Sequence, residues 1–99
     1  MINLSPTTKE YLKTPVATSD DPTASPPEFA FIDHGNSPAS IDWKTGEWEG
    51  AWSDGQVTAR ILVGPSATVT LTRGLWNCWL RVQDSPEIPE IRFDRVFVG

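Results

Sequence analysis

Gly74-Leu75-Trp76-Asn77-Cys78-Trp79-Leu80-Arg81-Val82-Gln83-Asp84 is the stretch that decides the fold class of this chain. From Trp76 onward its side chains follow the period-two pattern of a β-strand with one buried face. The alternation puts Trp76, Cys78, Leu80 and Val82 on the inner face and Asn77, Trp79, Arg81 and Gln83 on the outer face. Gly74 before the run and Ser85-Pro86 after it are turn residues, so we expect one strand between them.

Three further runs share this period. Residues 67–72 place Val69 and Leu71 inward and three threonines outward, so we expect them to pair with the first strand as a hairpin or corner. Residues 56–63 alternate cleanly and stop at Gly64-Pro65. Residues 91–98 begin with Ile91 and Phe93 inward and change phase at Arg95. The change predicts a β-bulge that turns Val96 and Val98, or Phe97, toward the core.

The first half of the chain is divided by proline and glycine. Residues 9–17 alternate weakly around Pro15, which cannot donate to a ladder, so we expect a first, outer strand. Residues 18–28 have the composition of a proline-rich loop. Residues 29–33 predict a short buried strand with Phe29 and Phe31 in the core. Glycines interrupt residues 38–55, which favours two short strands around turns over a helix.

Length and composition limit the architecture to one small all-β domain. Ninety-nine residues support a single core, and nine prolines with seven glycines favour short strands joined by turns. Short strands at regular spacing, without a helical pattern or an internal repeat, predict a β-sandwich. We expect the domain to span residues 9–99. An extended N-terminal arm, residues 1–8, should precede it, with Ile2 and Leu4 as its apolar side chains.

Charge and cysteine usage argue against several classes of function. The net charge is −5 and the isoelectric point about 4.6, and the eight lysines and arginines are scattered singly. We therefore expect no nucleic-acid partner. Neither a signal peptide nor a long apolar span is present, so we expect no membrane partner and synthesis in a cytoplasm. The single cysteine cannot form an internal disulfide.

Residues 74–78 resemble the corner-to-strand signature of immunoglobulin-like domains, in which a turn glycine or alanine precedes an aromatic residue and then a cysteine. Trp76 stands where tyrosine is usual, and Cys78 where the disulfide cysteine would be. The partner cysteine is absent, and the strand expected to carry it has Phe29 and Phe31 instead. The resemblance implies an immunoglobulin-like β-sandwich of about seven short antiparallel strands.

A second resemblance covers most of the chain. Its most specific parts are residues 59–65, Ala-Arg-Ile-Leu-Val-Gly-Pro, and residues 84–89, Asp-Ser-Pro-Glu-Ile-Pro. It also includes Leu4-Ser5, Glu10-Tyr11, Asp42-Trp43, Trp48, Trp52, Gly74 and residues 21–24 and 29–31. In these features the chain looks like small immunoglobulin-like virion proteins of tailed phages that infect actinobacteria. The resemblance implies structural work in a phage head or tail and supplies no catalytic residues.

The tryptophans permit three interpretations. Trp43, Trp48 and Trp52 crowd one loop region, and Trp79 lies on the outer face of its strand. Exposed rings in a row can stack on sugars, and rings with one wet edge are favoured at protein interfaces. Alternatively, Trp48 and Trp52 fold back over the open end of the sandwich as lids of the core.

No residue pattern here indicates catalysis, a cofactor or a metal. Four carboxylates stand close together in the sequence: Asp42, Glu47, Glu49 and Asp54. We expect a solvated acidic rim, because so small a domain offers little cleft for a glycosidase pair and the calcium-loop pattern is not met. The only histidine, His34, is expected in a turn. Cys78 is expected to be a small apolar core side chain.

The absence of catalytic patterns, together with what the resemblance to phage virion proteins implies, leads us to expect a non-enzymatic virion structural protein, made in the host cytoplasm. We expect a capsid decoration or minor capsid protein that docks on the head shell and stabilises it. The expected partners are the major capsid protein or other virion subunits, and a homo-oligomer is left open. The candidate partner-binding residues are Ile2, Leu4, Tyr11, Trp43, Trp48, Trp52 and Trp79.

Two alternatives to this prediction stay open at the level of the sequence. Within the same class, the chain is a tail or head-to-tail connector component. In another class, it is a carbohydrate-binding module that holds a host surface glycan on Trp43, Trp48 and Trp52.

Overall fold

The structure, a computed structural model, describes residues 1–33, 36–39, 42–83 and 88–99. These residues form eight strands and no α-helix. The strands are β1 (Ile2–Leu4), β2 (Glu10–Ala17), β3 (Glu28–Asp33), β4 (Lys44–Thr45), β5 (Glu47–Ser53), β6 (Gln56–Val63), β7 (Gly74–Arg81) and β8 (Glu90–Val98).

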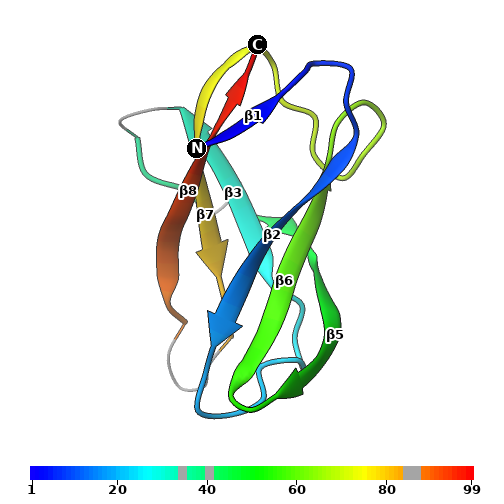
Figure 1. Ribbon diagram of the computed structural model, residues 1–99. Helices are drawn as coiled ribbons and strands as arrows, with labels where there is room; N and C mark the ends of the chain where they lie inside the picture. Colours follow the sequence, from blue (N-terminus) through cyan, green and yellow to red (C-terminus); the bar gives the residue numbers. More distant parts are fainter. Residues whose placement is uncertain (34–35, 40–41, 84–87) are drawn as a thin grey trace.

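The strands lie in two layers (Figure 1). Sheet A has five strands in the order β1-β8-β7-β3-β4, and sheet B has three in the order β2-β6-β5. Neighbouring strands pair antiparallel except β1, which runs parallel to β8. The all-β, two-sheet architecture that the alternating runs predicted is confirmed.

The core lies between the sheets because each contributes one apolar face. Every second residue of β6 is buried: Val57, Ala59, Ile61 and Val63. Both the bounds and the inner face of this strand agree with the alternation of residues 56–63. In sheet A, Phe29 and Cys78 have no exposed surface. The ring of Phe29 meets that of Phe93 edge to face, with centroids 5.9 Å apart.

Two glycine positions shape sheet B. A Cβ on Gly46 would lie 2.6 Å from the ring of Phe29 and 2.7 Å from the carbonyl oxygen of Arg60, so only glycine fits between them. Asp54 and Gly55 have φ values of 54° and 77°. Two successive positive φ angles make the type I′ turn that matches the twist of a hairpin, here between β5 and β6.

The N-terminal residues are not a free arm. They form β1, in which Ile2 pairs with Val96 and Leu4 with Val98. Leu4 is buried, and its carbonyl oxygen accepts a hydrogen bond from the Gly99 N–H at 3.1 Å. The expected extended arm over residues 1–8 was therefore wrong for residues 2–4. Three residues are too short to show a strand pattern, but the edge of β8 supplies them with backbone partners.

Residues 67–72 do not form the predicted strand. Only Val69 makes a bridge, to Val63, although Val69 is buried as the alternation required. The reason lies in the order of sheet A, because β7 already has β8 on one side and β3 on the other. No ladder position beside β7 is left for residues 67–72, which cross between the sheets as a loop with one buried valine.

The strand that carries Phe29 and Phe31 was expected to stand where the partner cysteine of Cys78 lies in immunoglobulin-like domains, which is in the other sheet, and this placement was wrong. In the structure β3 is the neighbour of β7 in sheet A, with Phe31 opposite Cys78. The residues that face Cys78 across the core come from sheet B. Alternation shows that a strand has an inner face, but it does not show to which sheet the strand belongs.

The C-terminal strand contains a bulge, as predicted, but the bulge lies at Phe93 and not at Arg95. The register of β8 against β7 shifts between Cys78 and Trp79, and Phe93 is the extra residue. After the shift Val96 and Val98 are buried while Phe97 is 44% exposed. Ile91 was expected inward, but it is 57% exposed, because it lies where the edge of the sandwich is open.

Candidate functional site

Trp48 and Trp52 of β5 close the core and are not an open platform. Both are half-buried and pack against the core cluster. The indole N–H of Trp48 donates to the Ser25 carbonyl oxygen at 2.8 Å, and that of Trp52 donates to Thr18 Oγ1 at 3.1 Å. Both bonds tie β5 to the loop over residues 18–27. The structure thus places these two rings as lids of the core.

Trp79 and Trp43 lie on the outer face of sheet A. Trp79 stands opposite Ala30, and its buried indole nitrogen has no hydrogen-bond partner among the residues that the structure describes. The guanidinium of Arg81 stacks on the ring of Trp43, 4.5 Å from the centroid. Arg81 also donates two hydrogen bonds to Glu28, at 3.1 and 3.0 Å. The outer face of this sheet therefore already carries a cation–π and ion-pair cluster of the chain's own residues.

The other three candidates also lie on the sandwich itself. Ile2 is half-buried and Leu4 buried within β1. Tyr11 of β2 is 39% exposed, and the guanidinium of Arg60 lies over its ring, 4.3 Å from the centroid. The seven candidates thus do not form one surface, because some lie on β1 at the edge of sheet A, some on the outer face of sheet A and some on sheet B.

Two of the four carboxylates, Glu47 and Glu49, make ion pairs on the outer face of sheet B. Glu47 and Glu49 accept hydrogen bonds from Arg60 at 2.9 and 3.1 Å. Lys13 donates to Glu49 at 2.7 Å, and this bond holds the pKa of Glu49 below its ordinary value. Within the described ranges no group of three or more His, Cys, Asp or Glu side chains could hold a metal ion. His34, expected in a turn, lies outside the described residues.

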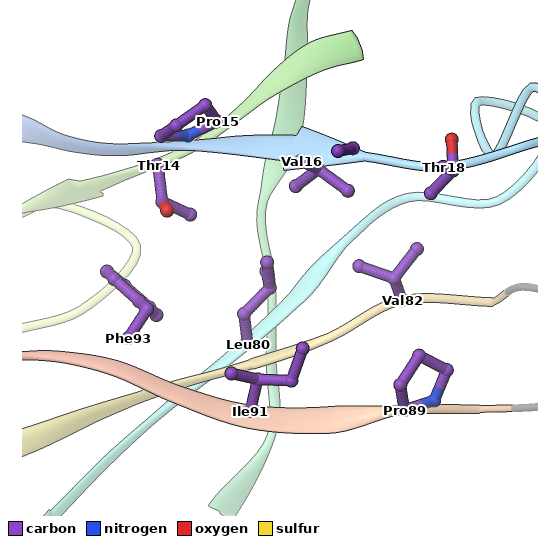
Figure 2. Close-up of a pocket in the computed structure, with 10 residues that line it drawn as sticks. Thr14, Pro15, Val16, Thr18, Leu80, Val82, Pro89, Ile91 and Phe93 are labelled. Carbon is purple, nitrogen blue, oxygen red and sulfur yellow. The ribbon is translucent and has the colours of Figure 1, made fainter. Parts of the chain in front are cut away.

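An apolar cleft opens between the edges of the two sheets (Figure 2). Thr14 and Val16 of β2 point toward Leu80, Ile91 and Phe93 of sheet A. The cleft has a volume of about 180 Å³. Pockets for drug-sized ligands usually hold about 300 to 1,000 Å³, so this cleft suits side chains better than a small molecule.

On one side of the cleft, β2 has a protected edge. It pairs only with β6 among the described strands. The Thr18 N–H donates to the Gly55 carbonyl oxygen, so even-numbered residues of this run turn their backbone groups toward β6 and odd-numbered ones toward the free side. Pro15 is odd-numbered, so the missing proline N–H falls on the free edge. Proline there hinders the addition of a further strand.

On the other side, β8 has an edge that no described strand covers over Glu90, Ile91 and Arg92. Strand β1 covers only Val96–Val98, so Glu90, Ile91 and Arg92 pair with β7 alone within the part of the chain described. The Val82 N–H donates to the Pro89 carbonyl oxygen at 3.3 Å, which turns Pro89 and Ile91 toward β7. The N–H and C=O groups of Glu90 and Arg92 therefore point to the open side. We call residues 89–93 of this strand the β8 edge.

The candidate site that the structure favours is the β8 edge with its cleft, and no sequence-predicted candidate lines it. The alternation of Ile91 and Phe93 was visible in the sequence. The sequence did not show that β1 ends before it reaches these two residues, because this depends on which strands are neighbours in the sheet. Pro15 was the available signal, since it indicated that the neighbouring edge strand is protected.

Comparisons with protein-family models, with curated proteins and with solved structures found no match. No helix in the described part of the chain is long and apolar enough to cross a membrane.

Proposed function

We propose that this protein is a non-enzymatic structural protein of a tailed-phage virion, which docks on shell subunits of the head and stabilises them. The observation that carries the proposal is the β8 edge, where the backbone groups of Glu90 and Arg92 have no partner among the described residues and lie beside an apolar cleft. Such an edge invites another chain, and natural proteins usually block it unless it is used. The phage assignment rests on the resemblance carried by residues 59–65 and 84–89.

The immunoglobulin-like identity of the sandwich is part of this proposal. In such domains one sheet holds strands B, E and D, and the other holds G, F and C, with C′ added in variable domains. Here β2, β6 and β5 take the places of B, E and D, while β8, β7, β3 and β4 take those of G, F, C and C′. The strand order therefore supports the resemblance seen in residues 74–78.

The corner before β7 adds a second support. In immunoglobulin domains the corner tyrosine, two residues before the cysteine, bonds through its hydroxyl to the backbone a few residues upstream. Trp76 stands two residues before Cys78, and its indole N–H donates to the Thr72 carbonyl oxygen at 3.0 Å. Tryptophan thus makes the bond that tyrosine makes elsewhere.

A docking role through a sheet edge fits the rest of the molecule. Many copies of a modest contact can hold firmly on a shell, because neighbouring sites raise the effective concentration of each. A chain that binds only assembled subunits also stabilises the assembled state by mass action. The net charge of −5 favours solubility of the free protein.

The glycan-binding alternative has less support from the geometry. It requires rings with a free face in one row, whereas Trp48 and Trp52 pack on the core and Trp43 lies under Arg81. The tail or connector alternative uses the same kind of contact as a head protein and differs from it in copy number.

Quantitative mass spectrometry of purified virions of the encoding phage tests the proposal. We expect this protein in a simple lattice ratio to the major shell subunit. A few copies per particle would move it to the tail or connector. Absence from the particles would overturn the virion proposal, whatever the free protein does in solution.

A further inference from the structure

We propose that the β8 edge pairs with the β8 edge of a second copy of this chain, antiparallel and centred on Ile91. The inference rests on the proposed role of this edge as an assembly contact and names its partner, so that two copies joined at this edge dock on the shell as one unit. Figure 1 shows the lower half of β8 along the left border of the molecule, where β1 no longer covers it.

Backbone geometry permits this pairing without a shift of phase. A dyad at Ile91 sets Glu90 opposite Arg92 of the second copy, and Arg92 opposite its Glu90. Both residues point their N–H and C=O groups to the open side, so each such pair exchanges two hydrogen bonds. Ile91 then faces its own copy in a pair without hydrogen bonds, where side chains approach most closely.

Several registers would keep Ile91 of both copies on the inner face of the joined sheet. Charge complementarity favours the register centred on Ile91 over the others. The side chains of Glu90 and Arg92 both lie on the outer face of sheet A, and the dyad makes two symmetric pairs of opposite charge between the copies. A dyad at Glu90 would put two glutamates together, and a dyad at Arg92 would put two arginines together. Arg92 makes no ion pair among the described residues, and Glu90 has only a 3.8 Å contact with Arg81.

The apolar surface at the edge supports the same arrangement. Ile91 is 57% exposed in the single chain although it points to the cleft. In the pair, Ile91 of each copy covers the other and closes the open side of the cleft beside Phe93. The pairing thus removes from water the apolar surface of Ile91 that a single chain leaves exposed.

The pairing also closes on itself. One dyad uses the same edge on both copies, so it makes a dimer and not an open chain of subunits. The β2 edge across the cleft resists further addition because of Pro15. Sheet A becomes one continuous sheet through the two copies. Strand β1, which pairs with β8 from Val96 onward, limits how far the contact extends along β8.

A cysteine at the dyad tests the contact directly. In an antiparallel pair without hydrogen bonds the Cα atoms lie about 4.5 Å apart, within the range of about 4.4 to 6.8 Å that a disulfide spans. Purified Ile91→Cys should therefore form a covalent dimer under mild oxidation. Phe97→Cys, on the same strand and 44% exposed, is the matched control and should stay monomeric. Equal cross-linking of the two variants, or none at position 91, would overturn the proposal.

Charge reversal gives a second, independent test by sedimentation. Arg92→Glu sets like charges together at both symmetric pairs, so dimer affinity should fall at least about tenfold. The double variant Glu90→Arg with Arg92→Glu restores opposite charges and should recover most of the affinity. Arg95→Glu, which lies outside the β8 edge, should not change the dimer affinity. Loss of dimer in the double variant without loss of fold by circular dichroism would contradict the proposed register.

The two proposals fail separately. A monomer in these solution tests that is nevertheless present in purified virions would remove the pairing and leave the virion role. A dimer that is absent from virions would keep the pairing and remove the role.

Discussion

Cys78 shows how a single buried side chain acquires its chemistry from its place in the core. It has no exposed surface, and burial together with the nearby Asp94 raises the pKa of its thiol to about 12. We expect native protein at pH 8 to resist labelling by a thiol reagent, and protein in denaturant to react fully, because the thiolate is the reactive form. Labelling of native protein at the denatured rate would show that this side chain is accessible.

The same shift gives a pH dependence of stability. The ordinary pKa of the thiol is 9.0, so below pH 9 its contribution is fully present. Above pH 9 the unfolded chain loses the proton that the folded chain still holds, and the free energy of unfolding falls as pH rises toward 12. Cys78→Ala should show a weaker decline between pH 8 and 10 in denaturant titrations.

Trp76 tests whether the corner hydrogen bond matters at the residue scale. Trp76→Tyr keeps a donor near the Thr72 carbonyl oxygen, whereas Trp76→Phe removes it. We expect the phenylalanine variant to be less stable than the tyrosine variant by about 1 kcal/mol, the usual net worth of one hydrogen bond. Urea denaturation measures the difference. Equal stability of the two variants would count against the corner analogy.

Single residues also mark the limit of sequence prediction. The inward phase of Cys78, Leu80 and Val82 was predictable, because alternation is a local property. The lid roles of Trp48 and Trp52 stayed one alternative among three. Their hydrogen-bond partners, Ser25 and Thr18, come from a distant loop.

At the scale of elements, β1 is the strand that the sequence concealed. Leu4 is buried beside Val98, and truncation of a buried leucine usually costs about 2 to 5 kcal/mol. We therefore expect Leu4→Ala to lower the free energy of unfolding by at least 2 kcal/mol. Asn3→Ala, an exposed change on the same strand, should alter it by less than about 0.5 kcal/mol. A free arm would leave both variants equally stable.

The other elements divide by how local their signals are. Strand β6 was predictable from the alternation of apolar and polar residues, and the bulge in β8 from a change in the phase of that alternation. Residues 67–72 alternate as well, yet they form no strand, because β7 is already paired on both sides. Strand neighbours, and with them the assignment of β3 to sheet A, depend on contacts between residues far apart in sequence.

At the scale of the whole molecule, function is argued from what the two sheets leave open. Sheet order predicts where backbone groups lack partners, and Pro15 distinguishes the β2 edge from the β8 edge. The seven residues first considered for binding lie on other parts of the sandwich. Those residues were chosen for the type of their side chains, whereas the β8 edge is recognised from which strands lie beside it in the sheet. The proposed assembly role thus rests on topology more than on any motif in the candidate site.

Amide hydrogen exchange at Glu90 and Arg92 is the measurement that tests this account most directly. Their N–H groups face the open side, so in dilute free protein they should exchange fast, like those of Tyr11 and Lys13 on the β2 edge. When the protein is concentrated or bound in particles, we expect exchange at Glu90 and Arg92 to slow while Tyr11 and Lys13 stay fast. Fast exchange at all four positions in particles would show that no chain covers the β8 edge, and would contradict its role as an assembly contact.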